Sequence, residues 1–203
     1  MKFIKWKILI ATSLVCLLPI LLGIYLWNEL PETIAIHFNF YNEPDTFVSK
    51  EVAVFGLPFL MMFIQVFSSV VTDLNAKKHG ESKKIERVAK WIIPVMSVVL
   101  YAVTLGYALG FSIDIRKCAM IILGIVFIVL GNYMPKLDYV KNYKLDTDKA
   151  RKTNRIMGFS LVIMGILGFI TIFLPPVSTI LWLIILIVLA MVSFVYCMMN
   201  AEK

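Results

Sequence analysis

The residues best suited to chemistry or recognition gather in one polar stretch, LPETIAIHFNFYNEPDTFVSK, at positions 30–50. Histidine, carboxylate and lysine side chains are those that proteins use for acid–base catalysis, metal binding and recognition of charged partners. A shared metal site is disfavoured, because the two histidines, His37 and His79, lie in polar segments separated by an apolar run that could span a membrane. The chain has no HExxH, GxSxG or Walker motif. We therefore expect no catalytic residue, no metal and no cofactor.

The composition limits which elements can position these residues. Of 203 residues, 60% are hydrophobic and only 16% are charged, whereas about a quarter of an average soluble protein is charged. This balance excludes a secreted disulfide scaffold, a disordered tail and an ordinary cytosolic enzyme, and it indicates a polytopic membrane protein. Cys16, Cys118 and Cys197 show no CxxC or Cys/His spacing. We expect them to pack as small apolar residues.

Six apolar segments are each close to the ~20 residues that cross a bilayer core of ~30 Å. They cover residues 8–27, 52–72, 91–111, 118–134, 156–174 and 177–199. The predicted fold is therefore all-α, with six transmembrane helices. No segment contains an ionisable Asp, Glu, Lys, Arg or His, and Gln65 is the strongly polar side chain near the middle of a span. We expect Gln65 to form an interhelical hydrogen bond, and a coupled transporter is disfavoured because such carriers need ionisable residues within the membrane.

The positions of the basic residues predict the orientation. Seventeen of the 20 Lys and Arg residues fall in the N-terminal segment, the connections 74–90 and 135–155, and the C-terminal tail, against three on the other side. The positive-inside rule then places both termini in the cytoplasm (N-in, C-in) and the stretch 30–50 outside. In the cytoplasmic connection 73–90 we expect a short basic helix interrupted at Gly80.

Local patterns predict structure within the external stretch. Every second residue of 34–40 is apolar, which is typical of a half-buried strand, with His37 and Asn39 facing outward. Residues 42–45, Asn-Glu-Pro-Asp, predict a turn in which the proline fixes φ and the aspartate bonds its own backbone. From these residues alone, an ordered interfacial loop and a recognition loop are both open.

Glycines and prolines indicate how the helices pack. The spacing Gly106-x-x-x-Gly110 predicts a close helix contact in the third span. A second small-residue face on the fifth span comprises Gly158, Gly165 and Gly168. Prolines inside the predicted helices, where they favour kinks, are Pro19, Pro58 and Pro94.

The external stretch also resembles a known signature. The residues that carry the resemblance are Pro31, Ile34, His37, Asn39, Pro44, Asp45 and Lys50, followed by the helix proline Pro58. They are similar to P-x-x-I-P-x-H-x-N, then G-x-P-D, then a lysine before a helix with an early proline. That pattern opens proteins of the SdpI family of bacterial membrane immunity proteins. Ala35 departs from its second proline, and Asn42 stands where glycine is common, but asparagine tolerates a positive φ.

A second block resembles the same family. It combines a G-N-x-x-P-K pattern with a K-T-N-R-x-x-G pattern, and its residues are Gly131, Asn132, Pro135, Lys136, Arg151, Lys152, Thr153, Asn154, Arg155 and Gly158. Between the two patterns, residues 137–151 are shorter than the family's usual G-I-R/K-T-P-W segment, which puts any role of that segment in doubt. The basic side chains are equally suited to bind lipid phosphates and to fix topology.

The resemblance implies a function. Members of this family confer resistance to secreted antimicrobial peptides of the cannibalism-toxin type, and some capture a cytosolic transcriptional repressor once toxin is bound. We expect toxin to bind at the outer face, around the external motif. The basic segments 76–90 and 136–155 would dock the repressor, and no direct contact with nucleic acid is implied. The expected location is the bacterial cytoplasmic membrane.

The predicted organisation is one membrane domain in three parts. Residues 1–74 form the first helical pair with its external loop, 75–117 form the basic loop and third helix, and 118–203 form an SdpI-like three-helix region. A different class remains open, namely a small membrane transporter or an accessory subunit of a peptide exporter. A lipid-interacting scaffold is a third alternative.

Overall fold

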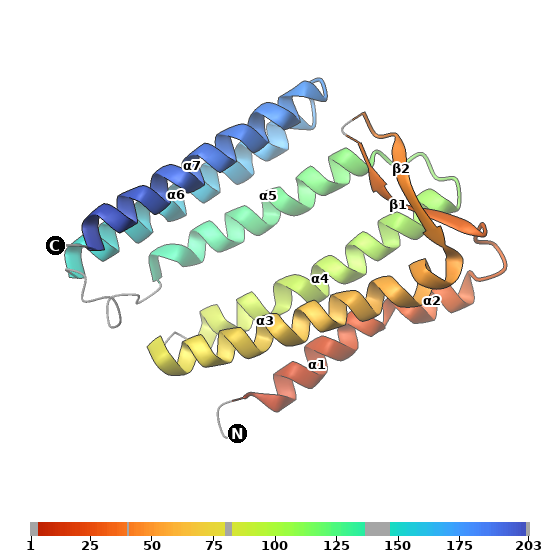
Figure 1. Cartoon of the computed structure of the whole chain (residues 1–203), viewed down its shortest axis with the longest axis horizontal. Coiled ribbons are helices and arrows are strands. Elements are labelled where there is room, and N and C mark those ends of the chain that lie inside the picture. Colours follow the sequence, from red (N-terminus) through yellow and green to blue (C-terminus); the bar gives the residue numbers. More distant parts are fainter. Residues whose placement is uncertain (1–3, 40, 80–82, 137–146, 202–203) are drawn as a thin grey trace. The chain divides into compact units, whose positions relative to one another are not determined.

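The computed structural model describes residues 4–39, 41–79, 83–136 and 147–201 (Figure 1). Its elements in chain order are α1 (Trp6–Leu17), α2 (Pro19–Tyr25), β1 (Thr33–Phe38), β2 (Pro44–Ser49), the π-helical turn η1 (Val52–Gly56), α3 (Leu57–His79), α4 (Lys83–Ala108), α5 (Ile115–Tyr133), the 3₁₀ turn η2 (Met134–Lys136), α6 (Thr147–Thr171) and α7 (Val177–Ala201).

The helices have the length and composition of membrane spans. Five apolar helical runs are long enough to cross a bilayer, and they are Trp6–Tyr25, Val52–Lys77, Ile85–Ala108, Ile115–Lys136 and Arg151–Thr171. A sixth apolar run, Val177–Val192, is shorter among the described side chains of α7. The prediction of an all-α polytopic membrane protein is confirmed. The side of the membrane on which each end lies stays a prediction.

The chain divides into two compact units. Unit 1 contains Met1–Asn75 and Glu86–Cys118, and unit 2 contains Ala76–Ile85 and Ala119–Lys203. In unit 1, α1, α3 and α4 run side by side, and the two strands form a hairpin at one end of these helices (Figure 1). Pro19 is the first residue of α2 and divides the first span into two helical pieces, as expected for a residue without a backbone N–H.

The helices of unit 1 extend further than the hydrophobic segments predict. We expected a short basic helix within 73–90, interrupted at Gly80. The described residues of this segment are helical, but they continue the two neighbouring spans, and Gly80 itself lies outside the described residues. Residues 73–79 are the last turns of α3, and residues 83–90 are the first turns of α4. Hydropathy marks where a helix becomes polar and not where it ends, so the end of the second span was placed too early and the start of the third span too late.

In unit 2, α5 and α6 approach each other through paired glycines. A Cβ atom on Gly165 would lie 2.7 Å from the carbonyl oxygen of Gly124, and one on Gly131 would lie 2.6 Å from that of Gly158. Each helix therefore offers glycines seven residues apart, which keeps two backbones in direct contact along one seam. The predicted packing face of the fifth span is confirmed at Gly158 and Gly165.

The other predicted glycine contact is wrong. Gly110 lies beyond the last residue of α4 and has φ +86°, so it belongs to the turn that ends this helix. A residue in that conformation favours glycine for backbone reasons. Gly106 faces the side chain of Ile113, which follows in the same turn region. The spacing of these two glycines therefore reflects a helix terminus and not a helix–helix seam.

The glycine seam predicts different outcomes for two substitutions on α6. Gly165→Ala places a methyl group against a backbone oxygen that cannot move independently, so we expect it to lower the free energy of unfolding by about 1–3 kcal/mol. Gly168→Ala is the matched control, because its Cβ would meet side-chain atoms at 3.5 Å, an ordinary contact distance. Thermal unfolding of the purified chain in detergent measures both. Equal melting temperatures for the two variants would contradict the seam.

Candidate functional site

The external motif folds as an antiparallel hairpin with an irregular register. Thr33 pairs with Ser49 and Ala35 with Phe47, but the next pair is His37 with Thr46, so Ile36 is an extra residue in β1. Such a bulge breaks the two-residue alternation of a strand. This explains why the predicted pattern holds only in part. Ile34 and Ala35 are both buried, although they are neighbours.

Two asparagines build the turn of the hairpin. The Oδ1 atom of Asn39 accepts hydrogen bonds from the backbone N–H groups of Tyr41 and Glu43, at 2.9 and 3.0 Å, and its Nδ2 donates to the Glu43 carboxylate. Asn42 has φ +68°, which confirms the expectation that asparagine replaces glycine there. Its side chain accepts a hydrogen bond from the Ile115 N–H at 2.7 Å and donates to the Ile113 carbonyl. The turn is thereby tied to the α4–α5 connection.

Pro44 and Asp45 differ from the prediction. The turn lies earlier than the predicted residues 42–45, because the Asn42 N–H donates to the Asn39 carbonyl at 3.0 Å, and Pro44 opens β2 opposite Phe38. The Asp45 carboxylate does not cap its own backbone in the described contacts; its Oδ1 lies 2.5 Å from Nδ1 of His37 and also accepts a hydrogen bond from Thr46. The side chains of His37 and Asp45 are 67% and 43% exposed. This pair is the ionisable part of the motif that remains accessible.

The base of the hairpin is held by a buried cation. Lys50 directly follows β2, and its Nζ donates to the Glu32 carboxylate at 3.0 Å and to the Leu30 carbonyl at 3.5 Å. The same ammonium lies 5.1 Å from the ring centroid of Trp27. Pro31 is exposed beside these contacts. The Lys50 side chain is only 9% exposed, and its contacts lie within the loop. This motif lysine therefore stabilises the base of the hairpin.

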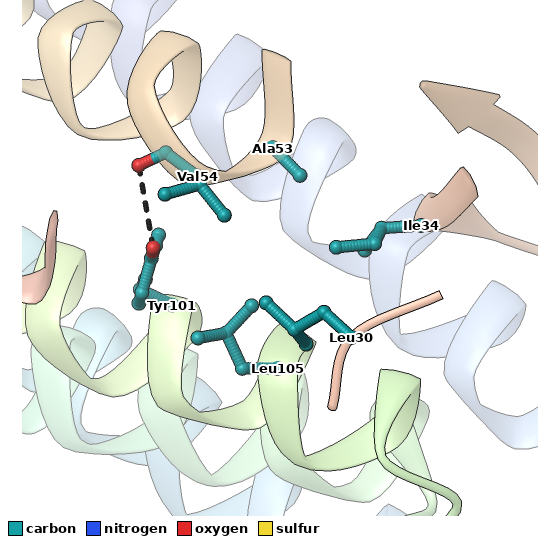
Figure 2. Packing of buried hydrophobic residues seen from close by; sticks show 6 residues of the cluster. All are labelled: Leu30, Ile34, Ala53, Val54, Tyr101 and Leu105. Carbon is teal, nitrogen blue, oxygen red and sulfur yellow. Dashed lines mark hydrogen bonds between the residues drawn. The ribbon is translucent and has the colours of Figure 1, made fainter. Parts of the chain in front are cut away.

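The hairpin continues into the apolar core of unit 1. Figure 2 shows Ile34 and Leu30 facing Val54 of η1 and Leu105 of α4. Phe38 adds an edge-to-face contact with the ring of Tyr107, with centroids 4.7 Å apart. The strand is thus fixed to the helix ends by its apolar residues.

At the junction with η1, the backbone N–H of Glu51 and the Ser49 hydroxyl lower the pKa of the exposed Glu51 carboxyl group. Hydrogen bonds to the charged form favour it.

The second motif lies in unit 2 and is mainly a packing motif. Its two glycines form the seam of α5 and α6, and Pro135 abuts the position of Gly158. Asn154 is buried, whereas Asn132 is exposed. Thr153 is half-buried, and Lys136 lies over the ring of Tyr133. The remaining basic members, Arg151, Lys152 and Arg155, are exposed on the first turns of α6. The segment 137–146 lies outside the described residues.

Comparison with known proteins found one matching family model and one similar protein. Residues 14–62, which include the whole hairpin, match the family model described as a domain of unknown function, DUF1648. Over 193 residues the chain is 28% identical to "Immunity protein SdpI" of Bacillus subtilis (strain 168), covering 92% of this chain and 91% of that protein. The chain is therefore similar to an SdpI immunity protein over nearly its whole length. No solved structure matches it.

The predicted resemblance to the SdpI family is therefore confirmed. The region shared with this SdpI protein extends well beyond the hairpin. It covers nearly the full length of both chains, so residues from both units of this chain take part in the match.

A buried charge cluster in unit 1 was missed by the sequence analysis. The Nζ atom of Lys90 lies 2.6 Å from Oδ1 of Asp73 and 3.2 Å from Oε1 of Glu86, and all three side chains are almost fully buried. Lys5 joins them through its backbone N–H, 3.1 Å from Asp73, and through its ammonium group, which pairs with Glu86. We refer to these four residues as the charge cluster. Among the described residues, no three His, Cys, Asp or Glu side chains are grouped to hold a metal ion.

Gln65 links this cluster to a backbone defect in α4. Pro94 cannot donate the hydrogen bond that the carbonyl of Lys90 would accept in a regular helix. The Nε2 atom of Gln65 donates to that carbonyl at 3.0 Å and to Oγ1 of Thr12 at 2.9 Å. The predicted interhelical hydrogen bond of Gln65 is confirmed, and its acceptors are now identified.

At the end of unit 1 that carries the hairpin, Tyr101 likewise donates to a backbone carbonyl that a proline leaves without a donor. Pro58 removes the N–H that an α-helix would offer to the carbonyl of Val54, which lies in the π-helical turn. The Tyr101 hydroxyl donates to this carbonyl at 3.2 Å, as the dashed line in Figure 2 shows. A Cβ atom on Gly23 would collide with the Tyr101 hydroxyl at 2.1 Å. Only glycine leaves room for this contact.

The Gln65 contact predicts an interaction between two distant substitutions. Gln65→Leu should lower the free energy of unfolding by about 1–3 kcal/mol, because the Lys90 carbonyl then has no donor. In a Pro94→Ala background the loss should be smaller, since residue 94 regains an N–H for that carbonyl. Thermal or denaturant unfolding of the four proteins in detergent gives the coupling energy.

Thr12→Val is the control for this cycle. It removes a partner of Gln65 but leaves the Lys90 carbonyl bonded, so its effect should be the same with Pro94 and with Ala at position 94. A Gln65→Leu effect that is equally large in both backgrounds would show that the freed carbonyl is not what Gln65 stabilises.

Proposed function

We propose that this chain is a membrane immunity protein that protects its host from a secreted antimicrobial peptide, with the hairpin as its recognition surface. The observation that carries the proposal is the homology to an SdpI immunity protein over nearly the full length of both chains. The hairpin supports it, because the residues of the external motif meet in one small folded element. By the predicted orientation this element faces the side from which a secreted peptide arrives.

The hairpin has the rigidity that recognition needs. Its turn is bonded to the α4–α5 connection by Asn42, its base is closed by Lys50, and its strand packs on the helix ends through Ile34. A surface held in this way loses little conformational entropy when a partner binds. His37 and Asp45 then project from a fixed frame.

The charge of the hairpin favours a cationic partner. Residues 29–51 carry five carboxylates, all exposed, and Lys50 is the single Lys or Arg among them. Because the Lys50 ammonium is buried against Glu32, it offers little positive charge to a ligand. Charge complementarity mainly speeds encounter and selects partners. A positively charged peptide toxin is therefore the partner that this surface suits.

The proposal predicts a separation between recognition and folding. His37→Ala should lower the protection of a toxin-sensitive host, because it removes an exposed contact group without disturbing the turn. Loss of one interface contact of about 1–2 kcal/mol corresponds to a roughly 5- to 30-fold loss of affinity. The measurement is survival against toxin concentration, with membrane abundance determined in parallel.

The matched control is Thr33→Ala, at the opposite end of β1 and also exposed. It should leave survival unchanged. If the unmodified chain gives no protection against any toxin tested, including a peptide encoded beside its own gene, the immunity proposal fails. Toxin-independent solute flux in proteoliposomes would instead favour the transporter alternative.

The finer part of the proposal is signalling by capture of a cytosolic transcriptional repressor. The support is the exposed basic cluster on the first turns of α6, Arg151, Lys152 and Arg155, which the predicted orientation places in the cytoplasm. This cluster begins where the glycine seam positions α6 rigidly against α5. It offers charge that an acidic surface of a soluble protein could bind.

Neutralising this cluster should uncouple signalling from protection. With all three residues changed to Gln, we expect a tagged repressor encoded near the chain's gene to remain soluble when toxin is added, while survival is unchanged. Co-sedimentation of the repressor with membrane vesicles is the measurement, and Lys117→Gln is the control basic substitution. Repressor that still co-sediments with the triple variant would exclude this docking surface.

A further inference from the structure

The members of the charge cluster of unit 1 differ in their exposure to solvent. Lys90, Asp73 and Glu86 have side chains that are 0–3% exposed, and they belong to helical runs apolar enough to span a membrane. Lys5 is different, because its side chain is 42% exposed and it precedes α1. One member of the cluster is therefore within reach of water, and three are not.

The charges balance only when Lys5 is in place. Asp73 and Glu86 together carry two negative charges, and Lys90 supplies one positive charge, so the buried trio alone is net negative. The Lys5 ammonium makes the cluster neutral. An uncompensated charge in a poorly polarisable site is costly, and a carboxylate in that position is relieved by taking up a proton. Departure of Lys5 and uptake of one proton are thus linked by charge balance.

Two further polar atoms extend from the cluster into the interior. The Oε1 atom of Gln65 and the hydroxyl of Ser69 are fully buried and have no hydrogen-bond partner among the described residues. Gln65, Ser69 and Asp73 are spaced four residues apart on α3, so they follow one face of the helix. Buried polar groups of this kind are rarely left unsatisfied in proteins. This observation is independent of the charges and indicates that the site accepts a small polar species.

We propose that Asp73, Glu86 and Lys90 form a proton-binding site whose occupancy is controlled by Lys5. With Lys5 bound, the site is neutral and holds no extra proton. When Lys5 leaves, one carboxylate takes a proton from water, and Ser69 and Gln65 offer hydrogen-bonding positions one and two turns further along α3. The ligand is a proton, delivered as hydronium or through water, and no oxidant or other co-reactant is needed.

Among the side chains that the structure describes, few other charges surround the cluster. From α1 the neutral Thr12 faces the site through Gln65, and from α3 and α4 the facing groups are those already named. Arg87 on α4 and Lys77 on α3 are exposed, so water screens them from the cluster. A carboxyl group that must be protonated in the folded chain contributes stability at low pH, and this contribution is lost as the pH rises and the proton dissociates.

Lys5→Met tests the proposal in the full-length chain purified in detergent. We expect infrared spectra to show the carbonyl stretch of a protonated carboxyl group at neutral pH, and its loss at alkaline pH together with a fall in melting temperature. Wild-type protein and Lys7→Met, which removes an exposed lysine nearby, should show neither. Lys5→Met combined with Glu86→Gln restores neutrality, so the band should be absent and the melting temperature should no longer depend on pH.

Lys5→Arg should behave as wild type, because it keeps the positive charge. If Lys5→Met folds only at acidic pH, that result also supports the proposal. The proposal is overturned if Lys5→Met shows no protonated carboxyl group and no pH dependence, if it fails to fold at every pH, or if the band persists in the Glu86→Gln double variant.

Discussion

The backbone of a membrane helix must have its hydrogen bonds satisfied by the protein, because the lipid core offers no alternative donor. In unit 1, Pro58 and Pro94 break this rule locally, and each of these two breaks is repaired from a neighbouring helix. Gln65 of α3 donates to the carbonyl that Pro94 leaves free on α4, and Tyr101 of α4 donates to the one that Pro58 leaves free near η1. The two repairs run in opposite directions between the same helices. They therefore fix the lateral pairing and the register of α3 and α4.

These repairs connect the two ends of unit 1. At one end, Gln65 bonds the backbone of Lys90, whose side chain holds the charge cluster together. At the other, Tyr101 and Val54 belong to the same apolar core as Ile34 of the hairpin. The hairpin and the charge cluster are consequently built on one rigid pair of helices. A change at either end must be accommodated by contacts that both ends share.

Sequence patterns predicted what depends on local chemistry. The strand within 34–40, the positive φ of Asn42 and the packing face at Gly158 and Gly165 follow from residue type and spacing. Predictions from the sequence failed where contacts between residues far apart in the chain determine the structure. Ala35 is buried beside Ile34 against the alternating pattern, and Ile36 is an extra residue that interrupts the pairing of β1. The charge cluster was missed because Asp73, Glu86 and Lys90 lie in a polar stretch of the sequence that resembles a loop. In the structure, these residues belong to the ends of α3 and α4.

The motif residues divide according to whether their polar atoms are already used. The polar atoms of Asn39, Asn42 and Lys50 form hydrogen bonds within the turn, with the α4–α5 connection and at the base of the loop, respectively. Under the proposed function, a substitution at any of them would impair protection by loosening the hairpin, so loss of activity alone cannot identify a contact with toxin. His37 and Asp45 bond mainly to each other and remain exposed. Under the proposed function, specificity for a particular peptide should therefore depend on this pair and on the exposed carboxylates around it. The other motif residues maintain the fold of the hairpin, which could present different exposed residues on the same framework.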